Sequence, residues 1–154
     1  MTRVMQADER PWLPIDAAGE NFMKIVSIDE DAKQVVLLVK FAPHAIYPKH
    51  KHVASAVAHT LAGEWEYEEG TLPVGAWAIE PPGTDHTPIV SAQGATILAI
   101  LTSNDDRYVE VPLEDVTVLH QDLAYFKRLY AMTPEQAARE AGIQVPMSKT
   151  EFAN

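Results

Sequence analysis

Short apolar runs, rich in valine, isoleucine, tryptophan and tyrosine, recur along the first 111 residues and are separated by glycine, proline, aspartate and asparagine. Runs of this length and composition are typical of β-strands. The pattern predicts strands at 22–28, 34–41, 53–61, 64–68, 75–79, 95–102 and 108–111. Many short strands at this spacing favour an all-β sandwich or barrel.

The predicted strand 64–68 shows the clearest alternation of polar and apolar positions. Trp65 and Tyr67 share one face, and Glu64, Glu66 and Glu68 share the other. This pattern indicates a half-buried strand, with the two aromatic side chains in the core and the glutamates in solvent. Trp77 is expected to pack in the core or against a sheet in the same way.

The last third of the chain changes to a helical pattern. Residues 120–131 carry apolar side chains at helical spacing and predict one helix, with His120 at its start. Thr133 and Pro134 then predict the N-cap and first turn of a second helix, which Gly142 ends. We expect the tail from Gln144 to be loosely packed.

Composition narrows the function classes. The chain has 154 residues, which predicts a single domain over 1–154, with strands over about 20–118 and helices over about 120–142. Twelve Lys and Arg against 22 Asp and Glu give a net charge of −10, which disfavours nucleic acids and anionic membranes as partners. The absence of cysteine excludes disulfides and thiolate sites. Without a signal-like start or a long apolar run, we expect a cytoplasmic protein.

Three of the six histidines stand in an informative pattern. His50 and His52 flank one residue, so on a strand both imidazoles project from the same face. His86 follows a turn that Pro81 and Gly83 make sharp and stiff. A rigid turn of this kind can present a third imidazole to the first two.

These residues resemble the two sequence motifs of the cupin superfamily. The first motif, G-x5-H-x-H-x3-4-E-x6-G, matches at His50, His52 and Gly63; the second, G-x5-P-x-G-x2-H-x3-N, matches at Gly75, Pro81, Gly83 and His86. The resemblance implies an all-β jelly-roll barrel, here followed by short C-terminal helices, with a metal site on His50, His52 and His86.

The chain departs from the motifs at three positions. His44 and Val90 replace a glycine and an asparagine, and Ala56 replaces the glutamate ligand. Either the site is degenerate, or three imidazoles alone bind the metal. Three neutral ligands would leave a divalent ion with a local charge of about +2, which favours an anionic chelating substrate such as an enolate.

Within the superfamily the pattern is similar to three-histidine cupins that cleave β-diketones with iron(II) and dioxygen. Those enzymes have a glutamate six residues before the last histidine, where Glu80 stands, and an aromatic residue three residues before the first, where Tyr47 stands. Glu80 could orient a ligand or relay a proton, or be an ordinary strand-end residue; Tyr47 could line the pocket or pack at the barrel rim. The family's pocket aromatics fall on Ile97 and Leu101.

We therefore expect an iron(II) dioxygenase that cleaves a C–C bond of a small β-dicarbonyl compound, with dioxygen as co-substrate. A metal-dependent lyase, isomerase or hydrolase using Zn, Ni or Mn is the second hypothesis, and a non-catalytic metal- or ligand-binding protein is the third.

The layout also resembles the cupin half of zinc anti-sigma factors, although the glutamate ligand and the cysteine-containing zinc domain of those factors are missing. Exposed edge strands favour a homo-oligomer, a dimer or tetramer. His59 should point away from the metal, and His44 should lie at the surface or at the pocket mouth.

Overall fold

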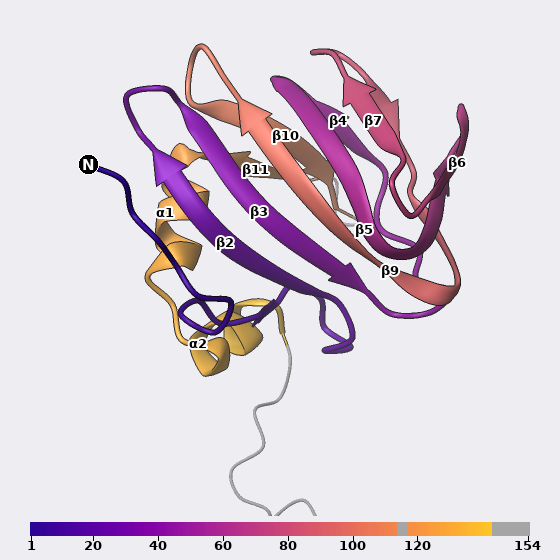
Figure 1. The fold of residues 1–154 in the computed structure, drawn as a ribbon, viewed down its shortest axis with the longest axis horizontal. Helices are drawn as coiled ribbons and strands as arrows, with labels where there is room; N and C mark the ends of the chain where they lie inside the picture. The colour runs from indigo at the N-terminus through magenta and orange to yellow at the C-terminus, as the bar shows by residue number, and fades with distance from the viewer. Residues whose placement is uncertain (114–116, 143–154) are drawn as a thin grey trace, which may run out of the picture.

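Two antiparallel β-sheets make up most of the computed structural model, which describes residues 1–113 and 117–142 (Figure 1). The larger sheet has seven strands, in the order β1 (Leu13–Pro14), β2 (Phe22–Asp29), β3 (Gln34–Phe41), β9 (Ile89–Thr102), β5 (Ser55–Tyr67) and β6 (Gly70–Pro73), with β7 (Trp77–Glu80) also paired to β5. The smaller sheet has the order β11 (Val118–Asp122), β10 (Arg107–Pro112), β4 (His50–His52) and β8 (Asp85–His86).

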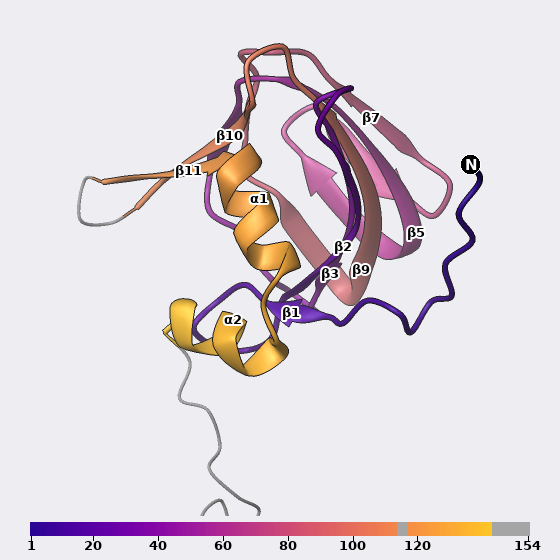
Figure 2. The same ribbon diagram turned by 90° about the vertical axis from the view of Figure 1, so that its left-hand side faces the viewer.

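The arrangement confirms the all-β jelly-roll prediction. The two sheets face each other, and they do not close into a continuous barrel. A helix, α1 (Leu123–Tyr130), contacts β2 of the larger sheet and β11 of the smaller one, so it covers the opening between them (Figure 2). The second helix, α2 (Pro134–Glu140), contacts β1.

The predicted strands 53–61 and 64–68 form one strand, β5, which bends where its register with β9 shifts on both sides of Gly63. Gly63 has a φ of 70°, and a Cβ there would lie 1.9 Å from the carbonyl oxygen of Gly94. Only glycine permits this close approach without displacing the backbone. The bend therefore continues the strand where the sequence pattern suggested an interruption.

The predicted first helix begins too early, because His120 lies in strand β11. α1 starts after Asp122, whose side chain accepts a hydrogen bond from the backbone N–H of Tyr125 and thus acts as N-cap. The second helix is confirmed, with Thr133 and Gln136 forming a capping box around Pro134. The predicted loose tail from Gln144 lies outside the described residues.

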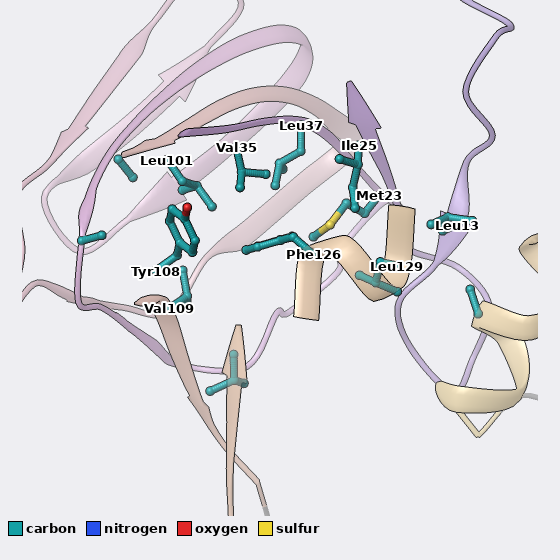
Figure 3. Close-up of a cluster of buried hydrophobic side chains, with 14 residues drawn as sticks. Leu13, Met23, Ile25, Val35, Leu37, Leu101, Tyr108, Val109, Phe126 and Leu129 are labelled. Carbon is teal, nitrogen blue, oxygen red and sulfur yellow. The ribbon is translucent and has the colours of Figure 1, made fainter. Parts of the chain in front are cut away.

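A hydrophobic core fills the space between the sheets and α1 (Figure 3). Phe126 of α1 and Tyr108 of β10 are fully buried, and their rings pack edge to face at a centroid distance of 5.6 Å. Around them lie apolar side chains of both sheets, among them Met23, Ile25, Val35, Leu37, Leu101 and Val109. The helix is thus held by burial of its apolar face.

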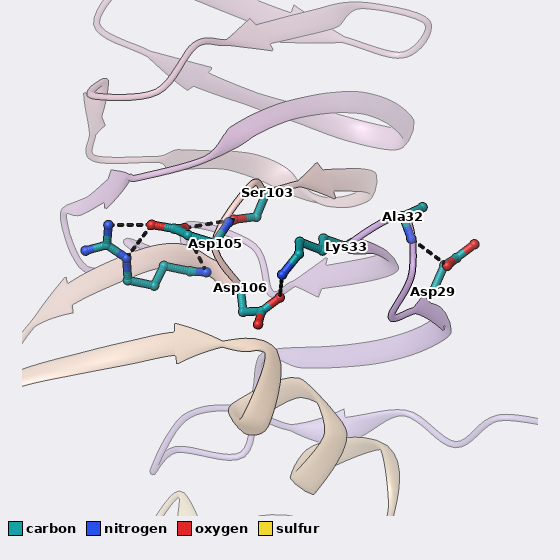
Figure 4. Close-up of polar contacts among 7 residues, drawn as sticks. Asp29, Ala32, Lys33, Ser103, Asp105 and Asp106 are labelled. Carbon is teal, nitrogen blue, oxygen red and sulfur yellow. Dashed lines mark hydrogen bonds and ion pairs between the residues drawn. The ribbon is translucent and has the colours of Figure 1, made fainter.

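Polar contacts connect the turns at one end of the two sheets (Figure 4). Lys33, before β3, forms an ion pair of 2.7 Å with Asp106, before β10, and Ser103 donates its backbone N–H to the Lys33 carbonyl. Asp105 accepts hydrogen bonds from Ser103 and Arg107. These contacts fix the crossing from the larger sheet into the smaller one.

Candidate metal centre

The two motif segments bring three imidazoles together on the inner face of the smaller sheet. β4 carries His50 and His52 on one face, and β8 pairs with β4 so that His86 lies directly opposite His50. The ring centroids lie 5.0 Å apart for His50 and His52, 5.4 Å for His52 and His86, and 6.3 Å for His50 and His86. All three side chains are buried. The predicted convergence of the histidines is therefore present.

The turn before His86 is tied directly to the backbone of His52. Gly83, with a φ of 92°, donates its N–H to the His52 carbonyl at 2.6 Å, and the His52 N–H donates to the Thr84 carbonyl at 2.9 Å. The Thr84 hydroxyl in turn donates to the Pro81 carbonyl. The glycine and proline of the second motif thus hold the turn against the strand of the first motif.

A carboxylate also reaches this site, from the strand beside the one where the motif expects it. β7 pairs with β5 so that Glu80 lies opposite Ala56. The Glu80 side chain is 4% exposed, with one oxygen 3.5 Å from His52 Nε2 and the other 3.8 Å from His86 Nε2. Although Ala56 replaces the motif's glutamate, the imidazoles therefore still have an acid group beside them.

The donor atoms fit a metal ion. One donor atom each from His52, Glu80 and His86 lie within 4.8 Å of one another. In a tetrahedral site with bonds of about 2.0–2.1 Å, ligand atoms lie about 3.3–3.4 Å apart. The Glu80 oxygens lie at similar distances, 3.5 Å from His52 Nε2 and 3.8 Å from His86 Nε2. Within the described residues, both ring nitrogens of His52 and of His86 are buried without a hydrogen-bond partner. Such groups are costly unless something satisfies them, and a cation would do so.

His50 stands slightly apart from this donor group and is oriented by the backbone. Its Nδ1 lies 3.1 Å from the Pro48 carbonyl oxygen. If Nδ1 carries the proton, it donates to that carbonyl and leaves Nε2 unprotonated, which is the form that binds metal. His50 lines the same cavity as His52 and Glu80, so its ring can serve as a further ligand.

Tyr67 is a site residue that the sequence assigned only to the core. Its hydroxyl donates a 2.5 Å hydrogen bond to Glu80 Oε1, and its ring stacks on His86 with a centroid distance of 3.9 Å and an angle of 17°. The alternation in 64–68 correctly placed Tyr67 on the inner face. Its two contacts depend on where β7 and β8 lie relative to β5, which the alternation does not encode.

Burial favours the neutral form of two imidazoles of the site, those of His52 and His50. It lowers the pKa of His52 to about 3, with His50 and His86 acting in the same direction, and it also lowers the pKa of His50. Burial raises the pKa of Glu80, although the hydrogen bond from Tyr67 opposes this effect. It raises the pKa of the Tyr67 phenol as well, and nearby Glu80 adds to that rise. Neutral imidazole is the form that binds a metal ion.

A cavity of about 100 Å³ adjoins His50 and His52 and is lined mainly by apolar side chains of both sheets. Ile97 and Leu101 line it, as does Tyr47, whose ring lies 5.6 Å from that of His50. The small volume and apolar walls suit a small, weakly polar ligand that makes its polar contacts with the metal centre.

The other histidines lie away from this cavity. His59 stacks on Trp77 with a centroid distance of 3.9 Å, and its Nδ1 lies 3.2 Å from the Ala76 carbonyl oxygen. It therefore points away from the metal centre, as predicted. Trp77 is 55% exposed, so it packs on the sheet surface rather than in the core. His44 is exposed and adopts a positive φ of 60°.

A two-sheet jelly roll with two histidine-bearing motifs on paired strands defines a cupin. The sequence model of the ChrR cupin-like domain matches residues 1–103, and the chain belongs to that family. No curated protein matches the chain.

Solved structures share the fold at low sequence identity. An RmlC-like cupin from Ralstonia eutropha JMP134 has a TM-score of 0.74 and 18% identity, with 95% of this chain and 92% of that chain covered. An acetylacetone dioxygenase from Acinetobacter johnsonii has a TM-score of 0.69 and 11% identity, with coverages of 84% and 91%. The anti-sigma factor ChrR, solved in complex with SigE of Rhodobacter sphaeroides, has a TM-score of 0.54 and 16% identity, with coverages of 64% and 52%.

These likenesses concern the fold, and the functional argument comes from the site itself. In the described part of the chain, no helix has the length and apolar character needed to cross a bilayer.

Proposed function

We propose that this protein is an iron(II)-dependent dioxygenase that cleaves a C–C bond of a small β-dicarbonyl compound bound as a chelated enolate. His50, His52 and His86 would hold the metal, and Glu80 would take part in catalysis. The observation that carries the proposal is the set of buried ring nitrogens of His52 and His86, which have no hydrogen-bond partner among the described residues and face a carboxylate beside a small apolar cavity.

The donor set favours a metal over a simple histidine–glutamate ion pair. At 3.5 and 3.8 Å, the Glu80 oxygens lie beyond normal hydrogen-bond length from the two imidazoles. Burial also lowers the pKa of His52, so this imidazole is not positively charged at neutral pH. A metal ion can bind neutral imidazoles, and it also satisfies the buried nitrogens of His52 and His86.

The bound metal would supply Lewis acidity toward two carbonyl oxygens and one-electron chemistry toward dioxygen. Glu80 is placed to accept the proton that the dicarbonyl loses on forming its enolate. One of its oxygens, Oε1, is held by the Tyr67 hydroxyl, which leaves Oε2 to accept a proton. Burial raises the pKa of Glu80, which makes its carboxylate a stronger base than an exposed one.

The cavity walls would determine which dicarbonyl compounds enter. Ile97, Leu101 and Tyr47 border a space of about 100 Å³, which admits short alkyl groups and excludes bulky polar ones. Apolar walls also keep water from the reacting carbon. We therefore expect small alkyl diketones to be better substrates than sugars or sugar acids.

Oxygen uptake tests the proposal. Protein loaded anaerobically with iron(II) should consume one dioxygen per molecule of acetylacetone cleaved, and His52→Ala, prepared in the same way, should not. Zinc-loaded wild-type protein is the matched control, because zinc has no redox chemistry. If the iron protein is inert across a panel of diketones and aryl ketones, the oxygenase proposal is rejected.

The carboxylate among the donors favours a second candidate, a non-oxidative lyase, isomerase or hydrolase that uses Zn, Ni or Mn as a Lewis acid. Glu80 lowers the local charge of the centre to about +1, a combination of ligands that suits such metals. Zinc that is retained through purification, with turnover of an enolisable substrate and no oxygen uptake, would favour this candidate. Zinc retained without any turnover would favour a non-catalytic metal-binding role.

A further inference from the structure

The imidazole of His86 has a second nitrogen that the metal centre does not use. Nε2 faces Glu80, and a neutral imidazole binds a metal ion through one nitrogen, so Nδ1 needs another partner. Nδ1 is buried, and within the part of the chain that the structure describes it has no hydrogen-bond partner. The His86 side chain as a whole is 6% exposed. A buried polar atom without a partner is costly, so we expect something to satisfy it.

Two carboxylates lie on the Nδ1 side of this ring. Glu68 and Glu69 form the two-residue connection between β5 and β6, since Tyr67 pairs with Gly70 across the hairpin. A Glu69 oxygen lies 3.8 Å from His86 Nδ1. Donor atoms of Glu68, Glu69 and His86 all lie within 4.8 Å of one another. We refer to these three side chains as the outer donor group.

Neighbouring groups hold the outer donor group in place. The ring of Tyr67 stacks on His86 at 3.9 Å and 17°, which fixes the plane of the imidazole. Glu68 Oε1 accepts a hydrogen bond of 3.3 Å from the backbone N–H of Thr87. At 3.8 Å, the Glu69 oxygen is too far from Nδ1 for a hydrogen bond. That separation is closer to the one between two ligands of a single ion, about 3.3–3.4 Å for bonds of about 2.0–2.1 Å.

We propose that Glu68, Glu69 and His86 Nδ1 form a second divalent cation site, which holds the metal ion from solvent before it enters the inner centre. Two carboxylates neutralise the charge of a divalent ion, and the ion removes the repulsion between them. A set of one imidazole and two carboxylates accepts Mn, Fe or Zn. The net charge of −10 also attracts cations to the protein.

A groove connects the outer donor group with the inner centre. Glu69, His86 and Glu80 all border this groove, which has a volume of about 350 Å³. The inner cavity is lined mainly by apolar side chains, which a hydrated ion does not cross readily. An ion at the outer donor group would already contact His86, and Glu80 lies beside the other nitrogen of the same ring. The groove is therefore the better route for the metal.

The two sites share His86 and therefore exclude each other. Once Nε2 binds the inner ion, Nδ1 carries the proton and has no lone pair for a second ion. The outer donor group then offers only two exposed carboxylates, too few ligands to retain an ion through dialysis. The loaded protein should thus hold one ion. This inference concerns metal uptake and does not depend on which reaction the centre catalyses.

Manganese binding to a protein without the inner centre tests the proposal. The background is the double variant His52→Ala/Glu80→Gln, which should bind one Mn(II), measured as loss of the EPR signal of the free ion. Adding Glu69→Gln should weaken this binding at least about 10-fold, because even residues that only support a ligand contribute that much. Glu66→Gln is the matched control, since Glu66 is exposed on β5, carries the same charge and lies outside the outer donor group. It should bind like the background.

Loading kinetics give a second readout that leaves the inner centre intact. In stopped-flow exchange of zinc with a coloured chelator at low salt, Glu69→Gln should load and release zinc at least about threefold more slowly than the wild type. Both rates should fall equally, so Kd stays unchanged, and the difference should shrink at high salt. Glu66→Gln should load at the wild-type rate.

Four results would overturn the proposal. They are no manganese binding in the background, binding there that Glu69→Gln leaves unchanged, equal weakening by Glu66→Gln, and wild-type loading rates in Glu69→Gln. Because the background lacks two donors of the inner centre, its manganese binding is measured separately from any failure of that centre to bind metal or to react with dioxygen.

Discussion

Glu80 illustrates what the sequence could and could not predict about the site. The histidines were predictable because an i, i+2 pair shares a strand face and because Gly83 and Pro81 define the turn before His86. The family resemblance pointed to Glu80 through its spacing from His86, but its distance from the imidazoles depends on the register that sets it opposite Ala56. Strand register is determined by the whole sheet, so no short motif contains it.

Glu80→Gln tests the contribution of this carboxylate. The variant keeps the shape and can still accept the Tyr67 hydrogen bond, but it loses the charge and the proton acceptor. We expect metal affinity to fall about 10–100-fold and turnover to fall about 10²–10⁴-fold. Chelator competition and steady-state kinetics measure the two effects.

Glu69→Gln is the matched control for that variant. Glu69 is 70% exposed and lies 3.8 Å from His86 Nδ1, on the side away from Glu80. Its removal should change affinity and turnover much less. Equal effects of the two substitutions would show that Glu80 has no special role.

Tyr108 provides a prediction about stability alone. Its hydroxyl is buried and has no hydrogen-bond partner within the described residues, while its ring packs on Phe126. Tyr108→Phe removes the unsatisfied hydroxyl and keeps the ring contact, so the free energy of unfolding should rise by about 1 kcal/mol. Urea denaturation measures this change, and a loss of stability would show that the hydroxyl is satisfied in solution.

The strands were predicted well where alternation was clean, and β3 has the predicted bounds, 34–41. The errors have specific physical causes. Gly63 bends β5 without ending it, so one strand was predicted as two. The apolar spacing of 120–131 begins in β11, and sheet pairing with β10 decides the conformation of His120. Tertiary pairing overrides local preference in both cases.

Gly63→Ala tests the bend in β5. The new Cβ would meet the Gly94 carbonyl oxygen, and the backbone would hold a non-glycine residue at a φ of 70°. We expect a loss of several kcal/mol in the free energy of unfolding. Gly75→Ala is the matched control, because Gly75 has a φ of 87° with nothing within 4 Å of the added Cβ. A similar, small loss in both variants would show that the close approach is unimportant.

The molecule as a whole places the metal centre between two sheets that the core and α1 hold together. The sequence predicted the jelly roll and the helices, but not which strands α1 contacts, namely β2 and β11. That position follows from burial of Phe126 and Leu129, which requires both sheets to be in place.

Metal binding should stabilise the whole fold, because the metal binds the folded chain. At a free metal concentration 100 times Kd, the free energy of unfolding should rise by about 2.7 kcal/mol. For a chain of this size that corresponds to an increase of about 5–10 °C in the melting temperature, reversed by a chelator. Calorimetry with zinc measures the shift. The same shift in His52→Ala would place the metal elsewhere.

The central claim is that the imidazoles of the two cupin motifs bind one metal ion together. Metal analysis after dialysis, on wild-type protein and on His52→Ala, His86→Ala and His120→Ala, tests this most directly. His120 is a suitable control because it is an exposed histidine of β11. We predict one equivalent of metal in the wild type and in His120→Ala, and less than about a tenth in the other two variants. Equal metal content in all four proteins, or none in the wild type, would contradict the claim.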